Sequence, residues 1–328
     1  MVDMAIETIA TIARGIHDNI ELVIVGKAEV VELVLVAILC EGHVLIEDVP
    51  GIGKTLMARS VARSLGCTFR RIQCTPDLLP SDVTGTYIYN QKTSDFEFRA
   101  GPIFSQVLLA DEINRATPRT QSAFLEAMEE RQVTTDGDTR PLLRPFLVLA
   151  TQNPVELEGT FPLPEAQLDR FLMRVRMGYP NEAQDELIME RFAHINPIED
   201  LAPVLSAEQL LELQLTCRDV LVESDVRQYI IKLVHATREH PQVELGASPR
   251  AMLGLLRAAQ ALASVRDRSY VIPDDVKYLA PFVLEHRIIP HAQSHLRGHT
   301  AADILTEVLD SVPVPVEQEA TAQPSTGG

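Results

Sequence analysis

The sequence predicts an α/β fold in which a parallel sheet is covered by helices and followed by a smaller all-α domain. Three observations lead to this prediction. Short apolar segments alternate with helical stretches through the first half of the 328-residue chain, as in a parallel sheet with crossover helices. A glycine-containing loop joins the first of these segments to a helix. After residue 180 the strand signals stop, and only helical periodicity remains.

The alternation gives the expected elements of the first half in order. The expected strands are His43–Glu47, Thr68–Cys74, Val107–Ala110, Phe146–Thr151 and Phe171–Met177. Helices are expected at about 3–18, 28–40, 54–65, 118–130 and 164–169. Two hairpins interrupt the alternation, one at Thr86–Phe98 and one from Gln132 to about Leu143. The second is expected to turn at Asp136-Gly137, a dipeptide that suits tight hairpin turns.

Composition divides the rest of the chain. A hinge is expected near Gly178–Pro180, so residues 1–179 form the α/β domain and residues 180–310 a helical one. Val226–Arg238 and Arg250–Val265 are examples of its helices, which prolines interrupt. From about Ser311 the chain has several prolines, no aromatic residue and a Ser-Thr-Gly-Gly end. Residues 311–328 are therefore predicted to be a disordered tail.

Composition also limits the compartment and the partners. Hydrophobic residues make up 46% and charged residues 23% of the chain, the balance of a globular protein. The longest apolar run, Leu33–Cys40, is too short for membrane insertion. The cysteines (Cys40, Cys67, Cys74 and Cys217) form no C-x-x-C pair, which favours reduced thiols and predicts a cytoplasmic protein. With a net charge of −17 and no basic stripe, nucleic acid is not an expected partner.

The loop after the first expected strand has the residues of a phosphate site. It reads Asp48-Val49-Pro50-Gly51-Ile52-Gly53-Lys54-Thr55, and Leu56 follows in the helix. Gly51 and Gly53 allow backbone N–H groups to approach a triphosphate closely. Lys54 is predicted to reach the β- and γ-phosphates of ATP and Thr55 to ligate Mg²⁺, while the helix dipole favours the same anion.

One residue departs from the pattern G-x-x-x-x-G-K-[ST], because Asp48 stands where the first glycine is expected. Asp tolerates unusual backbone angles better than most residues, and this position is the farthest from the β- and γ-phosphates. The effect of Asp48 on the tightness of ATP binding stays open. The alternative interpretation of the loop is a strand-to-helix turn that contains glycines and a surface lysine.

A second motif supports the phosphate site. The apolar strand Val107–Ala110 ends in Asp111 and Glu112. A buried parallel strand that ends in two acids delivers both to the carboxyl edge of the sheet, where the phosphate loop also emerges. Asp111 is predicted to hold Mg²⁺, and Glu112 to orient and polarise the attacking water. An acid that caps a following helix would explain one of these carboxylates but hardly both.

With both motifs present, the chain resembles the MoxR family of AAA+ ATPases from about residue 20 to residue 300. The blocks that carry the resemblance are Val49–Thr55, Leu79–Gly85, Phe98–Phe104, Asp111–Ala116, Ala150–Pro154, Leu163–Phe171 and Ser248–Arg250. The resemblance implies an AAA+ P-loop domain followed by an α-helical lid, with ATP and Mg²⁺ as cofactors. It also implies that the hairpin at Thr86–Phe98 is the helix-2 insert and that the hairpin near Asp136 is the pre-sensor hairpin.

The resemblance assigns three further site residues. Asn153 takes the sensor-1 place, where its amide could hold a water against the γ-phosphate; the alternative is a capping role before Pro154. Arg170 takes the place of an arginine finger that reaches the neighbouring subunit's γ-phosphate; the alternative is a plain salt bridge. The rival fingers are Arg115, Arg174 and Arg176. Arg250 takes the sensor-2 place, in cis or in trans.

The position of Arg250 carries an independent physical argument. Ser248 and Pro249 are good N-cap and N1 residues, so Arg250 is expected in the first turn of a helix. A cation at that end opposes the helix dipole. A nearby phosphate would remove this penalty, which supports a nucleotide-binding role for Arg250.

The resemblance implies a ring of identical subunits, expected to be a hexamer, that hydrolyses ATP at its interfaces and remodels or matures partner proteins. The expected client is a von Willebrand factor A domain protein, with which such ATPases commonly pair. One alternative is a nucleotide-gated interaction module with little turnover, against which Glu112, Asn153 and Arg170 all argue. Another is a chelatase-type or DNA-associated motor. A DNA motor should have basic hairpin tips, and the tips at residues 90–95 and 135–138 are not basic.

Overall fold

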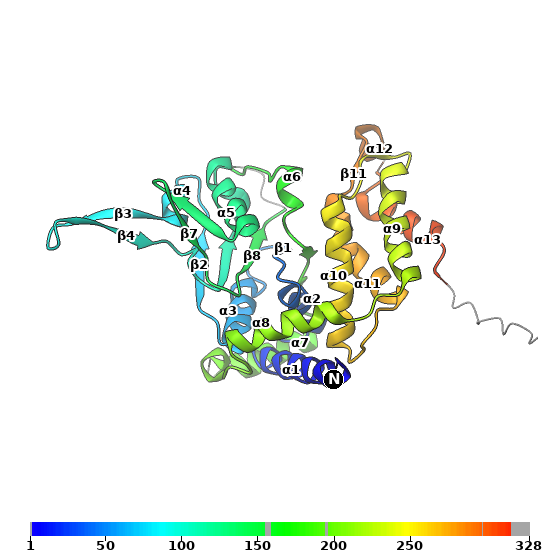
Figure 1. The fold of residues 1–328 in the computed structure, drawn as a ribbon, viewed down its shortest axis with the longest axis horizontal. Coiled ribbons are helices and arrows are strands. Elements are labelled where there is room, and N and C mark those ends of the chain that lie inside the picture. The colour runs from blue at the N-terminus through cyan, green and yellow to red at the C-terminus, as the bar shows by residue number, and fades with distance from the viewer. Residues whose placement is uncertain (1, 155–158, 194–195, 297, 316–328) are drawn as a thin grey trace, which may run out of the picture.

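The computed structural model describes residues 2–154, 159–193, 196–296 and 298–315, which form an α/β domain and a helical lid (Figure 1). The elements up to the hinge are α1 (Val2–Glu21), α2 (Ala28–Leu39), β1 (Val44–Glu47), α3 (Lys54–Ser64), β2 (Phe69–Gln73), α4 (Pro80–Thr84), β3 (Gly85–Asn90), β4 (Asp95–Ala100), β5 (Val107–Asp111), α5 (Pro118–Glu130), β6 (Gln132–Thr135), β7 (Asp138–Pro141), β8 (Leu147–Gln152), α6 (Glu165–Leu168) and β9 (Met173–Val175). The later elements are α7 (Glu182–Phe192), α8 (Ala207–Thr216), α9 (Ser224–Glu239), β10 (Val243–Leu245), α10 (Pro249–Val265), α11 (Pro273–Leu284), β11 (Ile289–Pro290), α12 (Ala292–Leu296) and α13 (Ala301–Ser311).

A five-stranded parallel sheet lies at the centre of the α/β domain. Its strand order is β2-β5-β8-β1-β9, so the five expected strands are present and the predicted fold class is confirmed. The central strands are almost entirely apolar because both faces of the sheet are covered. In β1, Val44 and Ile46 belong to one buried cluster and Leu45 to another. The first cluster joins the sheet to α1, α2, α3 and the lid, and the second joins it to α5.

Both expected hairpins are confirmed. In the first, β3 and β4 pair with Tyr87 opposite Phe98 and Tyr89 opposite Phe96, and the hairpin projects well away from the sheet (Figure 1). In the second, β6 and β7 are joined by Asp136-Gly137, whose φ angles of 53° and 90° are both positive. Such angles are typical of the tight turn that this dipeptide predicts.

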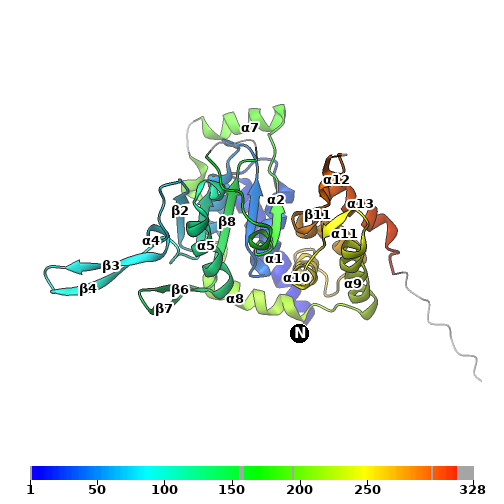
Figure 2. The ribbon, with the colours of Figure 1, turned by 90° about the horizontal axis from the view of Figure 1, so that it is seen from above.

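The helices after the hinge fall into two groups. Helices α7 and α8 lie against the α/β domain, where Gln214 of α8 donates a hydrogen bond of 2.7 Å to the Ile38 carbonyl. Helices α9, α10, α11 and α13 form the lid (Figures 1 and 2). Strands β10 and β11 pair in an antiparallel manner within the lid region, so the expectation of helices only in residues 181–310 is wrong there. These strands have three and two residues, too few to show an alternating pattern.

The last described residues pack against the lid. Helix α13 ends at Ser311, Val312 is buried, and Val314 contacts the main apolar cluster. Ordered contacts therefore extend into the predicted tail, because these two valines reach apolar surface. Residues 316–328 of that predicted tail lie outside the described residues. Within the described part of the chain, no helix is long and apolar enough to cross a bilayer.

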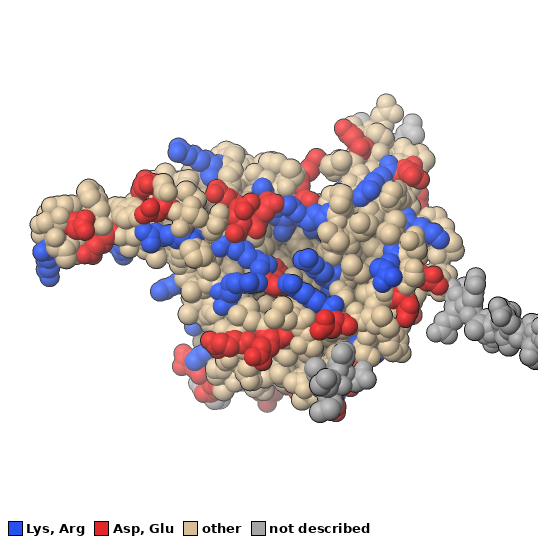
Figure 3. All heavy atoms as spheres, in the orientation of Figure 1, with Lys and Arg blue, Asp and Glu red and all other residues tan. Residues whose placement is uncertain are grey.

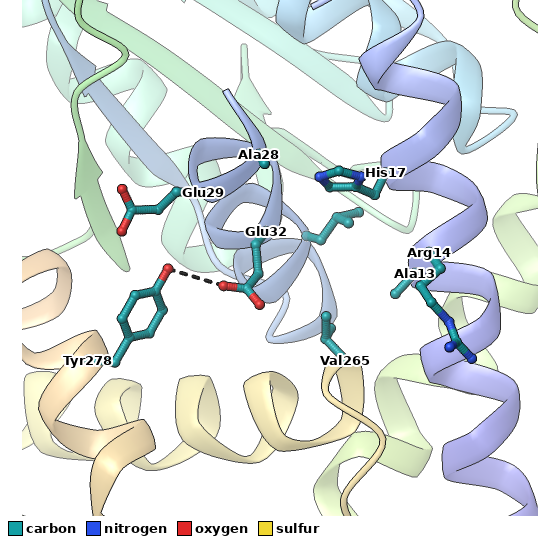
Figure 4. A pocket seen from close by; sticks show the side chains of 9 residues that line it. Ala13, Arg14, His17, Ala28, Glu29, Glu32, Val265 and Tyr278 are labelled. Atoms are coloured by element: carbon teal, nitrogen blue, oxygen red, sulfur yellow. Dashed lines mark hydrogen bonds between the residues drawn. The ribbon is translucent and has the colours of Figure 1, made fainter. Parts of the chain in front are cut away.

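A cavity of about 360 Å³ lies where α1 and α2 meet the lid (Figure 4). Arg14 and His17 line it from α1, Glu32 from α2 and Tyr278 from α11. Glu32 accepts a hydrogen bond of 3.1 Å from the Tyr278 hydroxyl and two bonds, of 3.0 and 2.9 Å, from Arg266. One carboxylate of the α/β domain thus binds two side chains of the lid.

Basic side chains gather at the centre of the face shown in Figure 3, although the chain has a net charge of −17. Arg131, Arg144 and Arg218 all bind the buried carboxylate of Glu41. Burial raises the pKa of Glu41, but hydrogen bonds and charge from Arg144 and Arg131 lower it below its ordinary value. These arginines come from three separate segments of the chain. The fold therefore brings them together in a basic cluster, although the sequence contains no basic stripe.

Candidate active site

The loop between β1 and α3 has the backbone geometry of a phosphate site. Gly51 and Gly53 have φ angles of 85° and 91°, a left-handed conformation that glycine adopts without strain. A Cβ atom placed on either glycine would meet no atom within 4 Å, so the loop borders open space. Gly53 caps α3, which begins with Lys54 and Thr55. The loop therefore joins open space to the positive end of a helix, as phosphate binding requires.

Lys54 lies within this loop and close to acidic side chains. The side chain is mostly buried, and its Nζ donates a hydrogen bond of 2.7 Å to the Asp48 carbonyl. Burial lowers the pKa of Lys54, whereas the carboxylates of Asp111, Asp48 and Glu112 favour its charged form. ATP phosphates would offer this ammonium stronger, charged acceptors than a carbonyl.

Asp48, which replaces the first glycine of the motif, connects the loop to the segment that follows β9. Its Oδ1 accepts a hydrogen bond of 2.8 Å from its neighbour Val49 N, and its Oδ2 accepts one of 2.6 Å from Gly178 N. A glycine could make neither contact. Lys27, the residue before α2, binds the same segment: its Nζ donates hydrogen bonds to the carbonyls of Gly178 and Tyr179 at 3.0 and 3.1 Å.

Thr151 fixes both acids of the second motif. Asp111 is the last residue of β5, and Glu112 follows it with φ 55° and ψ 52°, a conformation that costs energy for a side chain of this kind. The buried Thr151 hydroxyl accepts a hydrogen bond of 2.7 Å from Glu112 N and donates one of 2.6 Å to Asp111 Oδ1. This role of Thr151 could not be inferred from the sequence, since the two segments are 40 residues apart.

Strand β2 supplies further partners for the two acids. Arg71 NH2 lies 2.5 Å from Asp111 Oδ2. Gln73 Nε2 donates a hydrogen bond of 2.9 Å to Glu112 Oε2, which also accepts one of 3.1 Å from Arg115. Strand β2 thus positions the carboxylates of Asp111 and Glu112 through its side chains, in addition to its backbone pairing with β5.

Sheet order brings the predicted catalytic residues to one edge. Strand β8 lies between β1 and β5, and Asn153 directly follows β8 and is buried. Lys54 follows β1, and Asp111 and Glu112 end β5. Because the strands are parallel, all these residues lie at the carboxyl edge, where α/β sheets bind ligands.

A cavity of about 510 Å³ adjoins the phosphate loop. Its lining includes Val23, Ile24, Val25, Pro50, Ile52, Leu56, Met177, Tyr179, Ile188 and Phe192. Such an apolar lining beside a phosphate loop suits the flat, weakly polar base of a nucleotide. The segment Val23–Val25 was not among the predicted site residues, although the sequence shows it as an apolar triplet between two predicted helices.

Arg170 and Arg250 lie at the opposite edge of the sheet. Leu172 N donates a hydrogen bond of 2.8 Å to the His43 carbonyl, just before β1 begins. Since β1 and β9 are parallel, Arg170 precedes β9 at the amino edge, whereas the phosphate loop follows the carboxyl end of β1. Arg170 Nε binds Glu129 Oε2 at 2.7 Å, and Arg250 NH2 binds Glu129 Oε1. The structure therefore brings these two arginines together, apart from the subunit's own phosphate loop.

The expected start of helix α10 is confirmed. Ser248 is its N-cap and accepts a hydrogen bond of 3.1 Å from Ala251 N, and a proline occupies its first turn. Arg250 thus opposes the helix dipole as expected. Glu129 and Asp169, the latter at 3.8 Å, supply the negative charge that offsets this penalty, so the compensation does not by itself require a phosphate.

The rival fingers lie elsewhere. Arg115 binds Glu112, and Arg176 binds Glu47, the last residue of β1, at 2.9 Å. Arg174 lies 3.5 Å from Glu47 and 2.6 Å from Glu285. Arg115 and Arg176 are thus at the nucleotide edge of their own subunit, unlike Arg170.

This fold and site define a P-loop nucleotide-binding domain with a helical lid. Residues 43–173 match the family model described as "ATPase family associated with various cellular activities (AAA)", and residues 235–308 match that of the AAA lid domain. A crystal structure from Cytophaga hutchinsonii, described as a candidate ATPase, superposes with a TM-score of 0.90 at 40% identity, covering 95% of this chain and 98% of that one.

Two curated relatives narrow the family. The chain is 54% identical to the protein YeaC of Bacillus subtilis, over 92% of this chain and 95% of that one. It is 43% identical to the chaperone MoxR1 of Mycobacterium tuberculosis, over 97% of this chain and 85% of that one. The chain belongs to the MoxR family of AAA+ ATPases, and it is an ATP-hydrolysing enzyme.

Proposed function

We propose that the chain is the subunit of an ATP-driven ring, expected to be a hexamer, that remodels or matures partner proteins. One observation carries this proposal. Arg170 lies at the sheet edge opposite to the phosphate loop of its own subunit. If Arg170 is the finger, a site that contains Lys54 and Glu112 is completed when a second copy docks head to tail, and such contacts can close into rings.

Each residue at the carboxyl edge has a role in this proposal. The N–H groups of the loop Val49–Thr55 and the Lys54 ammonium bind the phosphates of ATP. Thr55 and Asp111 offer the hard oxygen ligands that suit Mg²⁺, which would neutralise phosphate charge. Glu112 orients and polarises the attacking water, and Asn153 holds that water against the γ-phosphate.

Arg170 and Arg250 serve the neighbouring copy in this proposal. Both bind Glu129 at the amino edge, so Arg250 also acts in trans. The amino edge also holds the three arginines that bind Glu41, and in this proposal they face the neighbouring copy as well.

The proposed client is a protein, of the von Willebrand factor A type, in the cytoplasm. The relative named chaperone MoxR1 supports protein remodelling. The tips of both projecting hairpins lack basic clusters, which disfavours nucleic acid. The arginines around Glu41 are each paired with that carboxylate, and we assign them to contacts between subunits rather than to DNA.

Mixing experiments test the ring. Arg170→Ala alone should keep ATP binding and lose hydrolysis, and Lys54→Ala alone should lose both. When the two variants are mixed, hybrid seams that pair an intact loop with an intact finger should recover part of the activity. No recovery at any ratio, with hybrid assembly shown by cross-linking, would contradict action in trans. For the client, Glu112→Gln held in ATP should retain a protein partner that the ADP form releases.

A further inference from the structure

We propose that Glu129 is a positioning residue that holds Arg170 and Arg250 ready for the phosphates bound on the neighbouring copy. This inference rests on the proposed action of Arg170 in trans. It concerns a residue that takes no part in the subunit's own nucleotide site.

Glu129 binds only one side of the Arg170 guanidinium. Arg170 binds Glu129 through its Nε, at 2.7 Å. The two terminal nitrogens of Arg170 make no hydrogen bond or ion pair within the part of the chain that the structure describes. A guanidinium presents five N–H donors in a rigid fork. Glu129 therefore fixes the fork from one side and leaves its other donors available for a phosphate.

The place of each residue in the fold is the second argument. Arg170 lies in a turn after α6, a helix of only four residues. Glu129 belongs to the last turn of the 13-residue helix α5, in which Phe124, Leu125 and Met128 are buried. A short turn cannot fix a long side chain by itself, whereas a helix anchored in the core can. Glu129 gives Arg170 a fixed point on the rigid part of the domain.

The lid supplies the third argument. Glu129 also binds Arg250 of α10, so one carboxylate joins the finger on the α/β domain to an arginine of the lid. Hydrogen bonding from Arg170 lowers the pKa of Glu129, burial opposes this shift, and the Arg250 charge lowers the pKa further. The carboxylate thus stays charged between two cations that would otherwise repel each other.

The neighbouring acid cannot replace Glu129. Asp169 already accepts hydrogen bonds from Arg287, at 2.7 Å, and from Ser248, at 3.0 and 3.1 Å. Arg287 is almost fully buried, so Asp169 is required to balance its charge. Loss of Glu129 therefore leaves Arg170 without an anchor.

The test compares Glu129→Ala and Glu129→Gln with the matched control Glu130→Gln, an exposed acid one residue further along. We expect Glu129→Ala to lower kcat by about 10–100-fold, as misplacement of a catalytic group by about 1 Å does. The KM for ATP should change less than about twofold, because the subunit's own phosphate loop is intact. Glu129→Gln keeps the size of the side chain and one acceptor oxygen, so its kcat should lie between those of the wild type and Glu129→Ala. The kcat of Glu130→Gln should match the wild type.

Two further measurements separate positioning from a merely structural role. Mixing Glu129→Ala with Lys54→Ala should restore activity, because hybrid seams pair an intact loop with an anchored finger. Adding Glu129→Ala to Arg170→Ala should lower kcat by a smaller factor than in the wild type, because only Arg250 is then left for Glu129 to position. Unchanged kcat in Glu129→Ala, or a multiplicative loss in the double variant, would overturn the role of Glu129 while leaving the trans finger intact. Full activity of Arg170→Ala would instead overturn the finger, and the role of Glu129 with it.

Discussion

Thr151→Val should separate the positioning of the two acids from nucleotide binding. Valine has nearly the shape of threonine but has no hydroxyl. The substitution removes the 2.7 Å bond from Glu112 N and the 2.6 Å bond to Asp111 Oδ1 at a buried site. The backbone N–H of Glu112 then loses its partner in a left-handed conformation that it does not adopt readily.

The magnitude follows from these two lost contacts. A buried polar group without a partner costs about 1–3 kcal/mol, so the two together should lower the free energy of unfolding by about 2–6 kcal/mol. Displacement of Glu112 should reduce kcat by about 10–100-fold. Binding of ATP should change little, because the Thr151 hydroxyl bonds to Glu112 and Asp111, whereas Lys54 bonds to the Asp48 carbonyl.

Three assays on one preparation check this prediction. Steady-state turnover gives kcat, binding of a fluorescent ATP analogue gives Kd, and denaturant unfolding gives stability. Thr151→Ser is the matched control, since it keeps the hydroxyl and loses only a methyl group. It should retain most of the turnover. Wild-type kcat in Thr151→Val, or an equal loss in Thr151→Ser, would refute the argument that the hydroxyl positions the acids.

Three further predictions concern the hinge, the lid and the charge of the surface. Asp48→Ala should weaken ATP binding several-fold and lower stability by about 1–2 kcal/mol, since the Gly178 N–H loses its acceptor; unchanged Kd and stability would contradict this. Tyr278→Phe should lower the free energy of unfolding by about 1 kcal/mol through loss of the bond to Glu32, and unfolding in urea that matches the wild type would count against it. Duplex or single-stranded DNA should leave the ATPase rate unchanged, and a DNA affinity that falls steeply with salt would exclude our choice of a protein client.

The parts of the site that could be predicted from the sequence are those in which neighbouring residues act together. The phosphate loop is one short segment. The two acids lie at the end of the strand Val107–Asp111, so the direction of that strand alone places them at the carboxyl edge of the sheet. The three central strands β1, β5 and β8 were identifiable because each is a short, mostly apolar run. The start of α10 was identifiable because Ser248 and Pro249 are local signals.

What the sequence could not show are contacts between distant segments. Three of these contacts join residues that are 40 or more positions apart: Thr151 with Asp111, Glu129 with Arg170, and Arg131 with Glu41. No local pattern selects these partners, because they depend on which strands are neighbours and on where α5 ends. The two lid strands were missed for a different reason: they are too short for a period to appear.

If Arg170 acts in trans as proposed, the direction of the strands explains why hydrolysis depends on a second copy. In a parallel sheet, residues that follow the strands and residues that precede them lie at opposite edges. In our proposal, the residues that follow β1, β5 and β8 bind ATP and activate the attacking water, and the arginine that precedes β9 completes the site of the neighbouring copy. One subunit cannot bring both edges to one ATP without breaking its own sheet. In the proposed ring a second copy does so after a translation and a rotation, which would make hydrolysis depend on assembly. Any partner that alters the seam then alters turnover, and nucleotide state in turn alters affinity for that partner.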